Sequence, residues 1–465
     1  MTIENNEDKL DPKLIKIAFI MLLGMLAPML DATVVNVAIK TIIEEFHSSI
    51  SLAQWLSTAY ILAMGIAIPL SGWLVNRFSG KAVYLFSLML FTIGSICASL
   101  AWSMESLIFF RVLQGAGAGV MMPVMQTILV RSAGRSKLPK LMSIISIPTA
   151  IIPILGPTIG GLIISHLAWK WIFIVNIPIC IIALIISKMY LPSDEAIDKT
   201  QVLDWVGLLL ISSAFCILIF GISALRNEMG GSMLHGMIFL AVGFILLFLY
   251  CIYSLLSKKE VPLNIRLFRH KEFSASIILV FLFSMFSTGM LFIFSLYFQQ
   301  AYQFSALIAG LLLAPQGIGM LVTRSIAANV MVKIGGRPVV LVGLLLSFLG
   351  TIPFVFFHSE SHLIFPILAL LIRGAGLGCI LIPIMSLVYN GLAKKDVPQG
   401  TTAMRMLQQI GGAFGIAVLA MALSHGVHVF GKSNVFSSFN QTFLWSAAFV
   451  AVSVIPVLFL PKKEN

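Results

Sequence analysis

The sequence predicts an all-α polytopic membrane protein with 14 transmembrane helices, and three observations support this. Hydrophobic residues make up 59% of the 465-residue chain and charged residues only 10%, against about 25% charged residues in a soluble domain. Apolar runs of about 18 residues or more, the length of a membrane-crossing helix, recur from end to end. Basic residues gather in alternate connecting loops, as the positive-inside rule requires.

The apolar runs place the spans in chain order and divide the chain into two halves. We expect a cytoplasmic tail at 1–13, an N-terminal six-helix bundle at 14–190 and two inserted helices with their flanking loops at 191–272. A C-terminal six-helix bundle at 273–461 and a cytoplasmic tail at 462–465 complete the chain. The first span lacks a signal-peptide cleavage pattern and is expected to stay as an anchor. The expected spans are 14–39, 52–75, 82–101, 106–130, 141–165, 170–190, 203–223, 234–256, 273–298, 306–331, 338–357, 363–390, 401–424 and 441–460.

The basic residues predict the orientation of the chain in the membrane. With both termini in the cytoplasm, the inner tails and loops hold 22 of the 30 Lys and Arg, and the outer loops hold only Lys40, Lys170, Arg226 and Lys432. This bias is strong, and an odd number of spans would destroy it. The net charge of +12 therefore reflects membrane topology, and no nucleic-acid partner is expected.

A sequence repeat links the two halves. Gly115-Ala-Gly-Ala-Gly119 begins four residues after Arg111, and Gly374-Ala-Gly-Leu-Gly378 begins one residue after Arg373. The segment 76–81 (NRFSGK) similarly corresponds to 332–337 (VKIGGR). Both pairs fall at matching places if spans 1–6 and 9–14 are equivalent. Secondary transporters are built from such repeats, with alternating access to a site near the midplane.

Asp31 is the only one of the 18 Asp and Glu residues that lies well inside a span. An ionisable group at bilayer depth costs about 2.5–3.5 kcal/mol on insertion scales and therefore indicates function. One carboxylate can bind a proton or a cationic group, but not both at once, which is the simplest chemistry for exchange. The alternative is a structural acid paired with an arginine on a neighbouring helix.

Arg111 is the second candidate for proton coupling. A guanidinium keeps its proton in proteins, so Arg111 can orient or stabilise a neighbouring acid but cannot carry the proton itself. Alternatively, it holds helix ends through hydrogen bonds to carbonyl groups. Arg324 and Arg405 lie nearer the cytoplasmic ends of their spans, where long basic side chains reach the interface. This is the position we expect for Arg324 in particular.

Several motifs resemble the major facilitator superfamily, and within it the fourteen-span drug:proton antiporters. They are the first-span run Leu30-Asp-Ala-Thr-Val-Val-Asn-Val-Ala-Ile39, the loop run Gly72-Trp-Leu-Val-Asn-Arg-Phe-Ser-Gly-Lys81, Arg111-Val-Leu-Gln-Gly115, Gly156-Pro-Thr-Ile-Gly-Gly161 and Trp169-Lys-Trp-Ile-Phe-Ile-Val-Asn-Ile-Pro178. The resemblance covers nearly the whole chain. It implies gating or conformational roles for Gly72, Asn76, Arg77, Lys81, Gly115, Gly156, Pro157, Gly160 and Gly161.

The chain departs from the family pattern at a few positions. Asn76 stands where the loop motif has Asp, so it can form a hydrogen bond but carries no charge. Ser79 replaces a glycine, Lys40 replaces the proline that ends the first-span motif, and Ile152 replaces a small residue before Gly156.

The resemblance implies a proton-coupled antiporter that exports lipophilic, often cationic, drugs or dyes. A cavity for such compounds is apolar with few polar groups, and Met side chains adapt to varied shapes. Core packing or a lipid-facing position is the alternative for each candidate. The candidate lining residues are Asn36, Trp55, Tyr60, Met121, Met122, Gln126, Phe286, Phe294, Gln316, Met385 and Arg405.

Other function classes fit the sequence less well. An enzyme would need clustered catalytic acids, His or Cys within spans, and the five cysteines show no metal-ligand spacing. The run 426–433 (GVHVFGKS) matches the phosphate-loop pattern, but no strand precedes it. We therefore expect a monomeric cell-membrane protein that is driven by the proton gradient, without ATP, metal or cofactor. Export of one natural metabolite, toxin or lipid is the alternative function.

Overall fold

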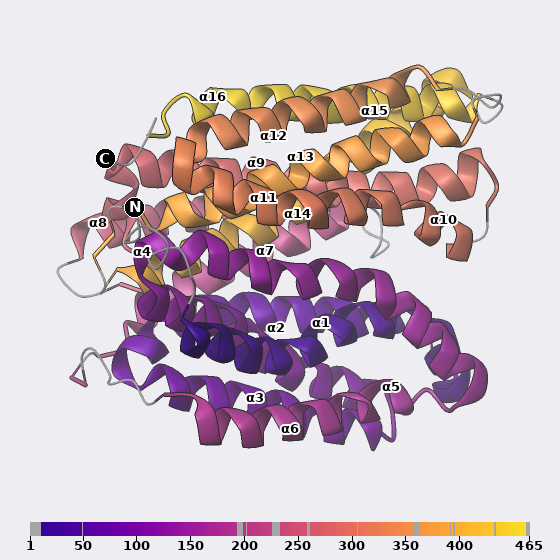
Figure 1. The fold of residues 1–465 in the computed structure, drawn as a ribbon. Helices are drawn as coiled ribbons and strands as arrows, with labels where there is room; N and C mark the ends of the chain where they lie inside the picture. Colours follow the sequence, from indigo (N-terminus) through magenta and orange to yellow (C-terminus); the bar gives the residue numbers. More distant parts are fainter. Residues whose placement is uncertain are drawn as a thin grey trace. The chain divides into compact units, whose positions relative to one another are not determined.

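The computed structural model describes residues 11–461, except 49, 193–198, 201, 226–232, 258–260, 305, 358–361, 391, 394–395 and 432–433. Over these residues the chain is helical and forms no strand (Figure 1). The first eight helices are α1 (Pro12–Phe46), α2 (Ile50–Arg77), α3 (Gly80–Ser99), α4 (Met104–His166), α5 (Trp171–Ile174), α6 (Asn176–Tyr190), α7 (Trp205–Leu225) and α8 (Met233–Leu256). The rest are η1 (Ile265–Arg269), α9 (Lys271–Leu296), η2 (Tyr297–Ala301), α10 (Ala306–Leu312), α11 (Ala314–Ile334), α12 (Gly336–Thr351), η3 (Ile352–Val355), α13 (Ile364–Val388), α14 (Val397–Phe430), α15 (Val435–Val452) and α16 (Val454–Val457).

Thirteen helical segments of the described residues are long and apolar enough to cross a membrane. They match thirteen of the fourteen expected spans in order. Helices suit these segments because a bilayer offers no hydrogen-bond partners to an open backbone. The remaining expected span, 141–165, lies within α4, where most side chains are outside the described set.

The helical assignment of α4 runs without a break where we expected a loop after residue 130. A straight helix would separate Arg111 from Gly156 by about 68 Å. Yet Arg111 bonds Asp31 and Gly156 lies against Thr33, only two residues further along α1. The chain therefore folds back on itself between residues 111 and 156, as two successive spans would require.

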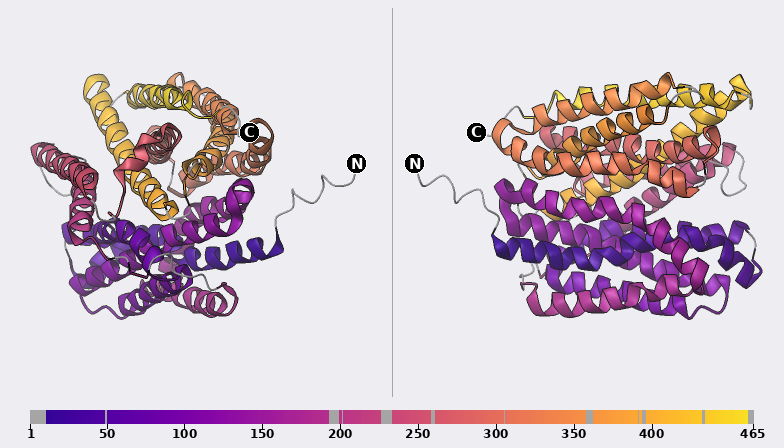
Figure 2. Two further views of the ribbon diagram at one scale, coloured as in Figure 1. Left: turned by 90° about the vertical axis from the view of Figure 1, so that its left-hand side faces the viewer. Right: turned by 45° about the vertical axis from the view of Figure 1, so that its right-hand side comes forward.

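The chain divides into two compact units, residues 1–208 with 392–402 and residues 209–391 with 403–465. The expected boundary followed the first six spans, whereas most of the inserted pair groups with the second unit. In the first unit α4 packs against α1, α2 and α3; in the second unit α13 packs against α9, α11 and α12. Figure 2 shows the long helices of each unit running alongside one another.

The repeated glycines make equivalent contacts in the two units. A Cβ added at Gly115 would collide with the carbonyl of Tyr60 on α2, and one at Gly374 would collide with the carbonyl of Gln316 on α11. Such close backbone approach is the usual role of small residues between membrane helices.

The same correspondence holds two and four residues further along the repeat. Gly117 lies against α3, while its counterpart Gly376 lies against α12. Gly119 returns to α2 at Met64, and Gly378 returns to α11 at Met320. The sequence repeat is therefore also a repeat of helix packing within each unit.

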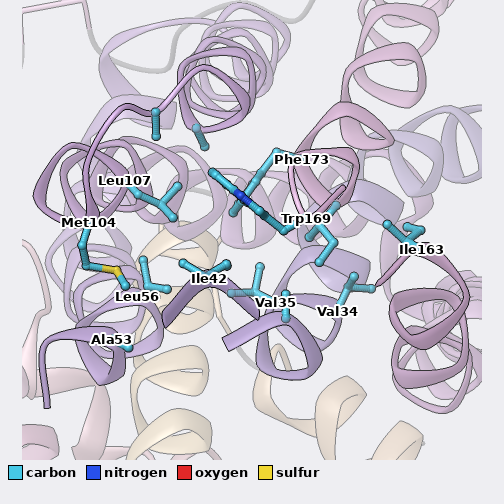
Figure 3. Close-up of a cluster of buried hydrophobic side chains, with 14 residues drawn as sticks. Val34, Val35, Ile42, Ala53, Leu56, Met104, Leu107, Ile163, Trp169 and Phe173 are labelled. Carbon is cyan, nitrogen blue, oxygen red and sulfur yellow. The ribbon is translucent and has the colours of Figure 1, made fainter. Parts of the chain in front are cut away.

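The first unit has an apolar cluster formed by several helices. Val34, Val35 and Ile42 of α1 meet Leu56 of α2 and Leu107 of α4 (Figure 3). Ala53, Met104, Ile163, Trp169 and Phe173 extend this cluster. It lies beside the ion pair of Asp31 and Arg111, so it limits water access there.

The two inserted helices pack on each other within the second unit. Gly221 of α7 lies against the backbone at Leu240 of α8, and Gly243 of α8 lies against Leu218 of α7. Tyr250 of α8 then fixes the segment before α9, because its hydroxyl donates to the carbonyl of Leu263 over 2.7 Å. The same hydroxyl accepts from the Leu263 amide over 2.8 Å.

Candidate functional site

Asp31 and Arg111 form a buried ion pair between α1 and α4. Each side chain belongs to a residue that is 1% exposed. Arg111 Nη1 donates to Asp31 Oδ2. The second carboxylate oxygen, Oδ1, accepts a hydrogen bond from Asn176 Nδ2 on α6 over 3.0 Å. Both oxygens of the acid therefore have partners from different helices.

Arg111 also connects α4 with α2. Its Nε donates to the carbonyl of Leu56 over 3.1 Å, and Nη1 also donates to Gln114 Oε1 over 3.0 Å. The Tyr60 ring lies against the guanidinium, with 4.2 Å between Arg111 Cζ and the ring centroid. The arrangement combines both sequence-based expectations for Arg111, since it pairs with an acid and also braces a carbonyl group.

A second layer of polar side chains supports the pair. Gln114 Nε2 donates to Ser95 Oγ over 2.8 Å, and Ser95 Oγ donates to the carbonyl of Phe91 over 2.9 Å. Sequence reasoning missed Asn176, Gln114 and Ser95 as members of this network. An isolated amide within an apolar run was the available signal, because a polar group at bilayer depth needs a partner.

The ion pair makes the interior of the first unit electrically balanced. Each charge alone would lose hydration worth several kcal/mol, and the mutual attraction and added hydrogen bonds offset this loss. A proton on Asp31, or a cation competing for it, would leave Arg111 without its counter-charge. Neutralisation of the acid would therefore remove an ionic contact between α1 and α4.

The second unit also contains a buried arginine, and the partners that the structure describes for it include no acid. Arg373 on α13 is also 1% exposed. Its Nη1 donates to Gln316 Oε1 on α11 over 2.6 Å, and its Nη2 donates to the carbonyl of Phe286 on α9 over 3.1 Å. The Phe294 ring centroid lies 5.3 Å from Arg373 Cζ. Gln316, Phe286 and Phe294, predicted as cavity residues, are thus brought together around this guanidinium.

The remaining cavity candidates are scattered among several environments. Met121 and Gln126 are buried, Met122, Met385 and Arg405 are half-buried, and Trp55 is 36% exposed. The side chain of Asn36 lies outside the described residues. Tyr60 is the candidate that joins the ion pair. A shared drug cavity stays a prediction for this set.

Two residues of the loop motif tie the first unit together. Asn76 Oδ1 accepts from Arg131 Nη2 of α4 over 3.1 Å, so the uncharged residue still forms the cross-helix contact. Lys81 Nζ donates to the carbonyl of Leu191 over 2.6 Å, while Arg77 is half-buried.

The candidate glycines of the first unit differ in their surroundings. Gly72 faces Thr402, and Gly156 and Gly160 lie against Thr33 and Val34 of α1. A Cβ at Gly161 would meet no atom within 4 Å. The side chain of Pro157 is outside the described residues.

The prediction that Arg324 reaches the membrane interface is wrong, since this residue is 3% exposed. Its helix α11 packs against α13, and the arginine side chain is buried within the second unit instead of being exposed. Arg405 is half-buried and donates to Gln408 Oε1 over 2.9 Å. Residues 426–430 of the phosphate-loop pattern belong to α14, and Lys432 and Ser433 are outside the described residues.

These spans, the internal repeat and the buried charges define a multi-pass helical membrane protein of the transporter type. A family model described as the Major Facilitator Superfamily matches residues 21–416, and the chain belongs to this superfamily. The expected family and fold class are thereby confirmed.

The chain is similar to transporters of bacteria and of humans. It is 31% identical to a "Multidrug resistance protein B homolog" of Mycobacterium tuberculosis, over 90% of this chain and 78% of that protein. It is 28% identical to the "Lincomycin resistance protein LmrB" of Bacillus subtilis, over 90% of this chain and 87% of that protein. The crystal structure of the human organic anion transporter MFSD10 aligns with a TM-score of 0.66 at 16% identity, covering 95% and 100% of the two chains. This last likeness concerns the fold alone.

Proposed function

We propose that this protein is a proton-coupled antiporter that exports lipophilic, often cationic, drugs across the cell membrane. Asp31 is the coupling acid and Arg111 is its partner. The observation that carries the proposal is the buried pair itself, in which one acid, 1% exposed, meets one arginine. The names of the relatives from Mycobacterium tuberculosis and Bacillus subtilis support drugs as the substrate class.

The geometry supports competition for a single acid. Arg111 and Asn176 occupy both oxygens of Asp31. A proton or a cationic drug must replace at least part of this bonding, and the two exclude each other on one carboxylate. Arg111 retains Leu56 and Gln114 as acceptors when Asp31 is neutralised. The exchange therefore alters the α1–α4 contact without leaving every donor of Arg111 unsatisfied.

The charge balance sets the driving force. Moving one elementary charge through 100 mV is worth about 2.3 kcal/mol. Exchange of one proton for one monovalent cation moves no net charge, so the pH gradient alone drives it. Export of a neutral compound would also draw on the membrane potential. The proposed topology has both termini in the cytoplasm, and the mechanism uses no ATP and no cofactor.

The first experiment measures ethidium transport in proteoliposomes under an imposed pH gradient. We expect the intact protein to accumulate the dye in a gradient-dependent way and Asp31→Asn to lose this dependence. Full transport by Asp31→Asn would contradict the coupling role. An intact, well-reconstituted protein that moves no dye would instead favour export of one natural compound.

The control must separate lost coupling from lost folding. Asp31→Asn leaves Arg111 buried without a counter-charge, which by itself is destabilising. The double variant Asp31→Asn with Arg111→Gln removes both charges and keeps hydrogen-bonding side chains. We expect it to reconstitute like the intact protein and still to show no gradient-driven transport. Asp31→Glu, which keeps the acid, should retain part of the coupling.

A further inference from the structure

Arg373 is a buried cation whose hydrogen bonding is incomplete. A guanidinium has five N–H donors, and Gln316 and Phe286 each accept from one of them. The Nε atom has no partner among the described residues. Both acceptors are neutral, and the nearby Phe294 ring supplies only a weak attraction for the cation.

The sequence of the second unit offers Arg373 no obvious counter-charge. Its five acids are Glu228, Glu260, Glu272, Glu360 and Glu464. Only Glu272 lies within a candidate span, at the second residue of Lys271–Ala301. That carboxylate accepts from Asn390 Nδ2 over 3.3 Å. Arg324, Arg373 and Arg405, in contrast, all fall within spans of this unit.

Burial of an unpaired charge is unfavourable because the protein does not replace its hydration. In the first unit this difficulty is absent, since Asp31 neutralises Arg111. At Arg373 the equivalent negative charge does not come from an acid of a neighbouring span. An anion from outside the chain would supply it and would also accept the unused N–H groups.

We propose that Arg373 forms an anion-binding site in the second unit, with Gln316 and Phe286 fixing the orientation of its guanidinium. The ligand is a monovalent anion, either the carboxylate group of a bound organic molecule or a dissolved anion such as chloride. A carboxylate suits the site because a guanidinium can donate two parallel hydrogen bonds to its two oxygens. The phenyl groups of Phe286 and Phe294 favour an organic anion with an aromatic body.

This site goes beyond the proposed coupling role of Asp31 and is tested without transport. Benzoate is titrated into the purified protein in neutral detergent, with gluconate holding the ionic strength constant and benzamide as the uncharged control. Chloride is titrated separately against gluconate. Samples are equilibrated before thermal unfolding, because a residue 1% exposed exchanges its ligand slowly.

We expect benzoate, chloride or both to raise the unfolding temperature by a saturable amount on the order of a few degrees. Benzamide should have no such effect. A rise with benzoate assigns the site to a carboxylate, and a rise with chloride alone assigns it to a dissolved anion. If neither anion acts in the intact protein, the proposal is wrong.

Matched variants locate the effect. Arg373→Gln should remove the anion-dependent rise, whereas Arg324→Gln, which removes another buried charge from the same unit, should keep it. Arg373→Lys retains the charge but loses the fork, and should need about tenfold more benzoate for half saturation. Arg373→Lys also tests the role of Arg373 if Arg373→Gln fails to fold. An unchanged response in the Arg373 variants would overturn the assignment.

Discussion

Arg111 on α4 and Arg373 on α13 are buried arginines of the two units, but they have different electrostatic partners. Both precede the repeated glycines, both are 1% exposed, and both donate to a backbone carbonyl of a neighbouring helix. Both also donate to an amide side chain, which lies on the same helix for Arg111 and on α11 for Arg373. Arg111 also bonds Asp31, whereas the described partners of Arg373 are neutral. Each unit therefore buries an arginine shortly before its repeated glycines, but an acid is among the described partners of Arg111 and not among those of Arg373.

The two units therefore combine similar helix packing with different partners for the buried arginine. The glycine contacts keep α4 close to α2 and α13 close to α11 in the same manner. Upon that scaffold the first unit holds a neutral pair that a proton can disturb. The second unit holds a positive charge that an anion can satisfy.

The largest expected effect tests this contrast directly. Arg111→Gln leaves Asp31 as an unpaired buried acid and should lower the free energy of unfolding by about 3–5 kcal/mol. Arg373→Gln removes a charge that lacks a protein counter-ion. We expect its effect to stay within about 1 kcal/mol, because relief of charge burial offsets the lost hydrogen bonds. Thermal unfolding of both variants in the same detergent measures the difference.

The double variant Arg111→Gln with Asp31→Asn is the control for this comparison. Since it removes both charges, it should recover most of the stability that Arg111→Gln loses. Equal destabilisation by Arg111→Gln and Arg373→Gln would show that the ion pair contributes no special stability. The comparison of the two units would then fail at its central point.

A smaller effect tests whether the scaffold is truly shared. Gly115→Ala and Gly374→Ala each place a Cβ against a carbonyl oxygen of the neighbouring helix. We expect both to lower the unfolding free energy, by about 1–3 kcal/mol each, because the helices must move apart. Gly161→Ala is a suitable control, since its Cβ would meet no atom within 4 Å. If only one of the two variants lost stability, the two glycines would be equivalent in the sequence but not in their helix packing.

The sequence predicted the spans and the buried acid because each depends on local composition. Thirteen candidate helices match expected spans, and Asp31 stands out as an isolated charge. The alternative interpretation of Asp31, an acid paired with a neighbouring arginine, describes the observed contact. That its partners are Arg111 and Asn176 could be known only from the packing of α1, α4 and α6. The prediction for Arg324 failed for the same reason, because the burial of this side chain depends on packing within the second unit that a lone helix does not show.

The smallest effect concerns the loop motif, where the two units also differ. Asn76 accepts a hydrogen bond from Arg131 over 3.1 Å, whereas Val332 at the corresponding repeat position has an apolar side chain that accepts none. Asn76→Asp would give Arg131 a charged acceptor of similar shape. Charge-assisted hydrogen bonds are stronger than neutral ones, but the contact is only partly buried. We therefore expect a gain of up to about 1 kcal/mol in unfolding free energy.

The salt dependence of this last variant separates charge from shape. A gain that comes from the Arg131 interaction should shrink between low salt and about 1 M salt, because the Debye length falls from about 30 Å to about 3 Å. Asn76→Ala, which removes the acceptor, should lower stability at every salt concentration. If Asn76→Asp is no more stable than the intact protein at low salt, the uncharged amide already satisfies Arg131. The first unit would then depend on its buried pair, rather than on its loop, for the charge that distinguishes it from the second.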